Sequence, residues 1–155
     1  IGKTHILAGK GFACFITCSF IMCIQYIGAK LFFKMPILEP SFFVLAYFCT
    51  ILCFVGMMML ISTLGRTEQS AGGAGWAMIM IMAMLGGCMM PLYFMPAWLR
   101  PFSNLSPVKW GIYALEGAIW RKFSLLEMAK PCLILLAIGF ATFILGVYNL
   151  SRQKD

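Results

Sequence analysis

The chain has 155 residues, of which 62% are hydrophobic and 11% charged, and its mean hydropathy is +0.92. A soluble domain is nearer half apolar and a quarter charged, so this composition argues against a soluble globular protein. The net charge is +7, but the Lys and Arg residues are scattered through loops, which is not the pattern of a nucleic-acid-binding surface. We therefore expect a lipid bilayer around the chain and no nucleic-acid partner.

Four long stretches of the sequence carry no charged residue, and each is close to or above the ~20 residues that cross a bilayer core. Such stretches suit membrane insertion, because a charge at the centre of a helix costs ~2.5–3.5 kcal/mol. We predict an all-α membrane protein that forms a single domain over residues 1–155. Its four transmembrane helices are expected at residues 11–33, 41–64, 70–90 and 131–150, with a re-entrant insert at 91–130.

Local signals refine three of these elements. The third span opens on the small residues 70–75, SAGGAG, which allow helices to approach closely. Residues 78–84, MIMIMAM, alternate as in a strand but lie in a long apolar segment without turn signals, so we predict a helix. Pro131 is expected at the start of the last span.

The first residue is Ile, and no signal peptide precedes the first span, so we expect an N-terminally truncated part of a longer chain.

The insert differs from the rest of the chain because it combines prolines with aromatic residues. Residues 96–105 predict one short amphipathic helix, in which Trp98, Phe102 and Leu105 share a face. A second is expected to start at Ser106 as N-cap, with proline in the first helical position, and to carry an apolar stripe. The stripe comprises Val108, Ile112, Leu115 and Ile119, while Lys109 and Glu116 lie together on another face. Irregular backbone at membrane depth is tolerated only against protein or a water-filled cavity. The insert therefore either lines a pathway or braces the membrane surface, and the residues alone leave both interpretations open.

Residues with catalytic or ligand-binding chemistry are few. The phosphate-binding pattern GxxxxGK[ST] does not occur, and the only histidine is His5, so we expect neither ATP hydrolysis nor another enzymatic activity. Two pairs of the seven cysteines, and two pairs of methionines, are one helical turn apart and could bind a soft metal ion, but apolar packing is the favoured interpretation. Gln25 is the most polar side chain well inside an apolar stretch. It is a candidate for lining a transport pathway, and its alternative role is a hydrogen bond between helices.

The distribution of basic residues gives an orientation. Alternating loops place five Lys and Arg residues on the side of the two chain ends and seven on the side of the insert. By the positive-inside rule, this count would place the insert in the cytoplasm.

Three segments resemble a known family, in the correct order and at the correct spacing. Residues 6–10, ILAGK, resemble the entry into a spanning helix, and residues 62–71, STLGRTEQSA, resemble a cytosolic turn. The strongest segment is 86–117, in which the match is carried by Pro91, Pro96, Trp98, Pro107 and Trp110. On these residues, the chain resembles the C-terminal part of an ABC-2 type transporter permease, the membrane subunit of an ATP-driven exporter.

This resemblance has several implications for the chain. The permease would have six spans, of which this chain holds the last four, and would lie in the plasma or inner membrane of the cell. Its C-terminus would be cytosolic and the insert extracytosolic, which contradicts the charge count. It would work with a separate ABC ATPase subunit or domain, which uses ATP and Mg, and with a second permease copy or homologous half; the chain itself would bind no cofactor.

The resemblance also suggests functional residues. The ATPase-contact candidates are Thr4, His5, Ile6 and Leu7, and the candidates for an outer gate are Pro91, Pro96, Trp98, Pro107, Trp110 and Glu116. Transport by alternating access is the function that this implies. The alternative is a non-transporting membrane scaffold or assembly protein, while a membrane-embedded enzyme would lack a catalytic set of residues.

Overall fold

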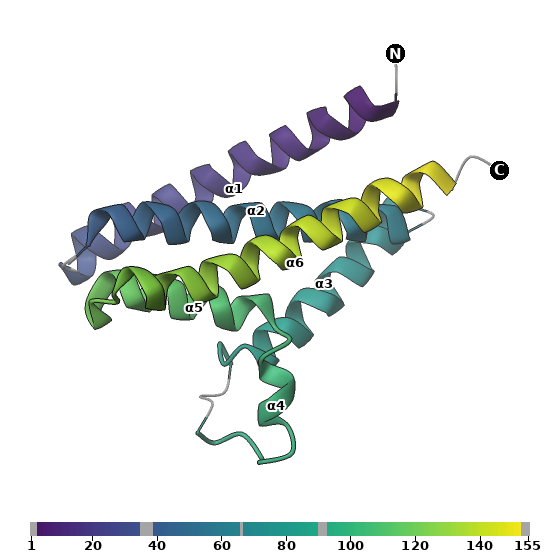
Figure 1. The fold of residues 1–155 in the computed structure, drawn as a ribbon. Helices are drawn as coiled ribbons and strands as arrows, with labels where there is room; N and C mark the ends of the chain where they lie inside the picture. The colour runs from purple at the N-terminus through teal and green to yellow at the C-terminus, as the bar shows by residue number, and fades with distance from the viewer. Residues whose placement is uncertain (1–2, 35–38, 66, 90–92, 153–155) are drawn as a thin grey trace.

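The computed structural model describes residues 3–34, 39–65, 67–89 and 93–152. These residues form helices joined by short turns, with no strand among them, which confirms the predicted all-α class (Figure 1). In chain order the elements are α1 (Lys3–Phe33), α2 (Pro40–Leu64), α3 (Glu68–Leu85), α4 (Arg100–Ser103), α5 (Pro107–Glu116), the π-helix η1 (Gly117–Arg121) and α6 (Leu125–Arg152).

Three helices, α1, α2 and α6, are long and apolar enough to cross a membrane, whereas α3 is shorter. With 18 residues, α3 is ~27 Å long, slightly less than the ~30 Å of a bilayer core. The expected end of this span at residue 90 is therefore wrong for the helix, which ends at Leu85. The reason is local, because Gly86 caps the helix and Gly87 adopts a left-handed φ of 90° that stops helical propagation.

The last span also begins at a different place from the prediction. Helix α6 starts at Leu125, and Pro131 lies inside it rather than at its start. Upstream, the backbone N–H and the hydroxyl of Ser124 both donate to Glu127 Oε2, at 2.8 and 3.0 Å. This Ser-x-x-Glu arrangement fixes the helix start in the manner of a capping box. Residues 125–130 therefore belong to the final helix, and the insert ends six residues earlier than expected (130 − 124).

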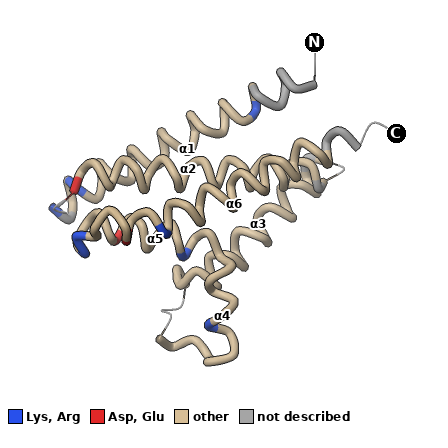
Figure 2. Tube along the Cα trace, in the orientation of Figure 1, with Lys and Arg blue, Asp and Glu red and all other residues tan. Residues whose placement is uncertain are grey.

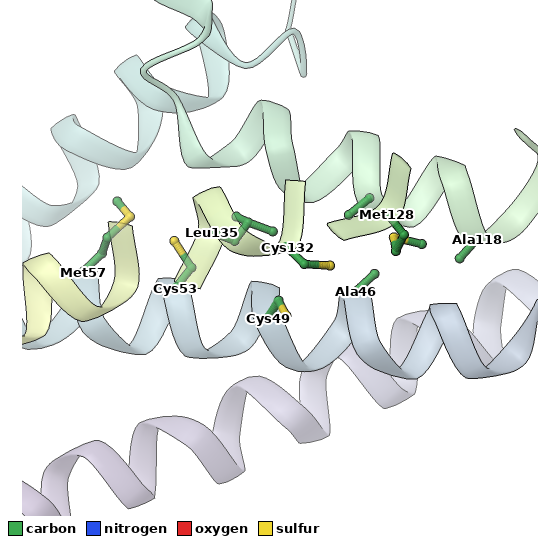
Figure 3. Close-up of a cluster of buried hydrophobic side chains, with 9 residues drawn as sticks. Ala46, Cys49, Cys53, Met57, Ala118, Met128, Cys132 and Leu135 are labelled. Atoms are coloured by element: carbon green, nitrogen blue, oxygen red, sulfur yellow. The ribbon is translucent and has the colours of Figure 1, made fainter. Parts of the chain in front are cut away.

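The core lies between α2 and α6, and α5 and η1 cover one end of it (Figure 3). A Cβ atom on Gly139 would lie 2.7 Å from the Cα of Cys53, and one on Gly146 would lie 3.1 Å from the backbone nitrogen of Leu60. A Cβ atom on Gly56 would collide with the carbonyl of Gly139. Glycines on both helices thus allow the two backbones to approach closely, as small residues do in membrane helix pairs.

The connections between the helices lie at two ends of the molecule (Figure 1). Helix α1 begins, and helix α6 ends, at the same end as the connection from α2 to α3. The connection from α1 to α2 and the turn after η1 lie at the opposite end. Helix α3 leaves the α2–α6 pair obliquely and carries α4 away from it, and α5 then returns along α2 and α6. The insert therefore leaves and rejoins the helix bundle.

Candidate functional site

The end of α3 and the start of α5 are joined through one carbonyl group. Met82 O accepts a hydrogen bond from Gly86 N at 2.8 Å and a second from Ser106 Oγ at 2.7 Å. Ser106 and Pro107 take the N-cap and first helical positions of α5, as predicted, but the Ser106 side chain bonds to α3 instead of capping its own helix. A Cβ atom on Gly86 would lie 2.8 Å from Val108 Cβ, so only glycine at this position allows the end of α3 to approach the start of α5 this closely. We call this contact the α3–α5 joint.

The segment between α3 and α5 is less helical than predicted. Among its described residues, 86–89 and 93–106, only the four residues of α4 form α-helix, and a turn in which Leu99 N donates to Pro96 O at 2.9 Å precedes them. The prediction of one amphipathic helix over 96–105 is therefore wrong; Pro96 and Pro101, within the expected helix, have no N–H to donate. Trp98, Phe102 and Leu105, which were expected to share a face of this helix, are each exposed.

Polar side chains close this segment onto itself. Arg100 donates from Nε to Met95 O at 3.2 Å and from Nη2 to Tyr93 O at 3.1 Å. Lys109 Nζ donates to Ser103 Oγ at 2.9 Å and to Asn104 Oδ1 at 2.7 Å, and burial lowers the pKa of this ammonium group below its ordinary value. Arg100 thus binds the backbone that precedes α4, and Lys109 binds the side chains at the end of α4.

Helix α5 contacts α2 through a face of small residues. Gly111 and Ala114 are buried, and a Cβ atom on Gly111 would lie 3.3 Å from Thr50 Cγ2. The predicted apolar stripe, residues 108, 112, 115 and 119, is partly buried. The buried face comprises Pro107, Gly111 and Ala114, which lie at helical spacing in the sequence. Hydropathy does not identify this face, because small residues differ little from their neighbours in hydropathy.

The end of α5 forms a compact charged and aromatic group. Glu116 and Arg121 form an ion pair with a nitrogen–oxygen distance of 3.0 Å, and the Arg121 guanidinium lies 5.6 Å from the centroid of the Tyr113 ring. The Tyr113 ring also contacts the Phe123 ring, with the two ring centroids 4.9 Å apart. Lys109 and Glu116, expected on a common face, have different partners. The chain then reverses at Lys122, whose φ of 48° is left-handed, and enters α6.

A pocket of about 220 Å³ lies between α1, α2, α5 and η1. Gln25 lines this pocket, together with Leu115 and Ile119 from the insert. The structure thus brings the pathway candidate of the first helix against the re-entrant segment. The alternative role of Gln25, a hydrogen bond between helices, has no support among the described residues, because its side chain makes none there.

The outer-gate candidates do not form one cluster. Trp98 and Pro96 are exposed, and Pro107 is buried at the α3–α5 joint. Trp110 donates from Nε1 to Asn104 O at 2.8 Å and so closes the turn before α5. Glu116 lies at the far end of the same helix, and Pro91 lies outside the described residues. The ATPase-contact candidates, residues 4–7, lie in the first turns of α1.

The two cysteine pairs at one-turn spacing lie in apolar packing: Cys49 and Cys53 in the α2–α6 core, and Cys14 and Cys18 on α1 where it packs against α2. The Cys49 and Cys132 thiols lie within hydrogen-bonding reach of each other in the α2–α6 core. Among the described residues there is no group of three or more His, Cys, Asp or Glu that could hold a metal ion. The cysteines of the core contribute to packing between α2 and α6 (Figure 3).

The comparison with protein families identifies the kind of protein. The sequence profile of ABC-2 type transporters matches residues 5–120, which include α1, α2, α3, α4 and α5. The chain belongs to the ABC-2 type transporter family. No significant match is found among curated proteins or among solved structures. Membership of the ABC-2 family confirms the resemblance and makes the chain part of a membrane-embedded permease of an ABC-type transporter, a kind of subunit that is generally non-catalytic and works with an ABC ATPase.

Proposed function

We propose that this ABC-2 permease exports a substrate across the cell membrane by alternating access, driven by an ABC ATPase. The observation that carries the proposal is the α3–α5 joint, which ties a shorter helix to a returning insert beside the α2–α6 pair. A transporter needs elements that can move relative to a fixed pair of helices. The α2–α6 pair, with the small-residue face of α5 packed on it, supplies the fixed part, while α3 and α4, which join α5 at its start, form the candidate for the moving outer gate.

Vectorial transport tests this function. The intact permease and its ATPase, reconstituted in vesicles, should move substrate in one direction with ATP, and an ATPase variant without its phosphate-binding lysine is the control. Transport that continues after the permease is omitted would overturn the proposal. An assembled complex that hydrolyses ATP without moving any compound of a broad substrate panel would favour the scaffold alternative.

We further propose that the C-terminus of the chain is cytosolic and the insert extracytosolic. Tyr93 is 72% exposed in the insert, so a cysteine at this position should react with a membrane-impermeant maleimide added outside intact cells. The Tyr93→Cys variant is compared with the parent in a background without the native cysteines. Labelling only after the cells are opened would instead support the orientation given by the count of basic residues.

The start of α1 is the proposed contact with the ATPase. The first turns of a helix that projects beyond the membrane are a suitable place for a second protein to push, and residues 4–7 lie there. Cysteines at these positions should crosslink to the ATPase, while a cysteine at Ile27, near the opposite end of α1, should not. A homodimer or a pair of homologous halves is the expected assembly, which crosslinking between differently tagged permease copies tests.

A further inference from the structure

We propose that the pocket between α1, α2 and the insert binds an anionic phospholipid of the bilayer, with the phosphate at Lys30 and an acyl chain among the apolar residues. The pocket has about 220 Å³, and its lining combines apolar and aromatic side chains with an amide and an ammonium group, those of Gln25 and Lys30, both from α1. The pocket includes Gln25, the pathway candidate, but the binding experiments below do not depend on transport.

The apolar part of the pocket suits a hydrocarbon chain. Phe43 from α2 and Leu115 and Ile119 from the insert form its walls together with Met22 and Tyr26 of α1. The rings of Tyr26 and Phe43 are in contact, with centroids 5.0 Å apart. Ile27 and Leu31 of α1, one of the candidate spans, are exposed beside the pocket. At the depth of such a span, the hydrocarbon chains of the bilayer are the apolar molecules that can enter the pocket from the membrane.

The two polar side chains are available for a lipid headgroup. Tyr47 also lines the pocket, but its hydroxyl already donates to Ser19 O at 2.6 Å. The side chains of Gln25 and Lys30 have no hydrogen bond or ion pair within the described part of the chain. They are five positions apart on one helix, and Lys30 lies in its last turn. The ammonium group can therefore reach the interface, where phosphates lie, and the Gln25 amide lies deeper, at the level of the ester groups.

The charge at this end of the molecule favours an anionic headgroup. Figure 2 shows that charged residues gather where α1 ends and where α5 meets α6. Five described basic residues lie there, against three acidic ones, and the carboxylate of Glu116 is paired with Arg121. The basic residues are Lys30, Lys34, Arg121, Lys122 and Lys130, and the acidic ones are Glu39, Glu116 and Glu127. Of these eight residues, Lys30 is the one that lines the pocket.

Lipid binding to the intact permease, measured by native mass spectrometry, tests the headgroup preference. Phosphatidylglycerol should bind about fivefold more tightly than phosphatidylcholine with the same acyl chains. The Lys30→Gln variant should lose this preference, and the Lys130→Gln variant should keep it, because Lys130 is exposed at the same end but does not line the pocket. Equal binding of the two lipids to the unaltered protein, or the same loss in both variants, would overturn the proposal.

A second measurement tests the acyl chain. Phosphatidylglycerol with a photoreactive acyl chain should label residues 22–30 or 115–119, and the Ile119→Trp variant, which fills the pocket, should weaken binding of both lipids. The volume-conserving Leu115→Met variant is the matched control and should bind as the unaltered protein does. Labelling confined to other segments would overturn the site, and so would full competition by soluble glycerol phosphate, since a free phosphate would then suffice. Monodisperse gel filtration of each variant shows that the measured protein is folded.

Discussion

Helices α1 and α6 are both apolar spans that pack against α2, but they make different contacts with it. Helix α6 meets α2 through glycines on both helices, and its close contacts involve backbone atoms. Helix α1 meets α2 through side chains such as Phe15 and Met22, and 0% of the residues in its most apolar window are buried, against 28% for α6. Hydropathy therefore determines which segments cross the membrane, while small residues determine which spans become close partners.

The largest difference between α6 and α1 is expected when one methyl group is added to a glycine of each helix. Gly139→Ala should lower the free energy of unfolding by about 1–3 kcal/mol, because the new Cβ would lie 2.7 Å from the Cα of Cys53 and force the helices apart. Gly28→Ala on α1 is the matched control, since no atom lies within 4 Å of its added Cβ. This change should be neutral, or stabilising by up to about 1 kcal/mol through helix propensity. Unfolding of both variants in detergent measures the difference, and equal effects would contradict it.

A smaller effect is expected at the α3–α5 joint. Ser106→Ala removes the hydrogen bond to Met82 O and should destabilise the protein by about 1 kcal/mol. Because the bond joins the insert to α3, exchange of the backbone amides of α5 should also become faster. Ser41→Ala, at an exposed position near the start of α2, is the control and should change neither quantity. Unchanged exchange in the Ser106 variant would show that the joint does not hold α5.

The polar contact of α1 with α2 should contribute still less. Tyr47→Phe removes the 2.6 Å hydrogen bond from the hydroxyl to Ser19 O, at an expected cost of about 0.6 kcal/mol. Tyr26→Phe serves as the comparison, since the ring contact with Phe43 at 5.0 Å does not need the hydroxyl. A loss for Tyr47→Phe as large as that of Gly139→Ala would show that α1 is held as firmly as α6.

The smallest effect is expected at the end of α5. The ion pair of Glu116 and Arg121 is partly exposed, with 28% and 50% of the side chains accessible. Glu116→Gln should therefore cost about 0.5 kcal/mol or less, and the difference should disappear in about 1 M salt. A salt-independent loss of transport, with unchanged stability, would instead assign Glu116 a role in the gate.

The sequence predicts most of what depends on hydropathy and local capping. The class, the position of α2 and the start of α5 at Ser106 and Pro107 are all confirmed. The start of α6 differs from the prediction, because the hydrogen bonds of the Ser124–Glu127 pair define it and Pro131 lies inside the helix. Helix α4 is short because Pro96 and Pro101 interrupt the expected helix, and the sequence alone does not show which residues between them stay helical.

The candidate site was less accessible to prediction. Gln25 and Pro107 were found by polarity and by position in a motif, and the structure places them in a pocket and in a joint. The hydrogen bond from the Ser106 hydroxyl to Met82 O joins residues 24 positions apart, so no local sequence pattern predicts it. Lys30 is not among the site residues that the sequence suggests, because its neighbours from α2 and α5 become adjacent only in the folded chain.

The pairing of α2 with α6 also has a consequence for biosynthesis. About sixty residues separate Leu64 from Leu125, and a ribosome needs on the order of 3–12 s to add them at ~5–20 residues per second. Throughout that time, the face of α2 that surrounds Gly56 is without its partner helix. Chains interrupted before α6 would keep this face open to other helices, so quality-control proteases have a physical mark that distinguishes an unfinished permease from a complete one.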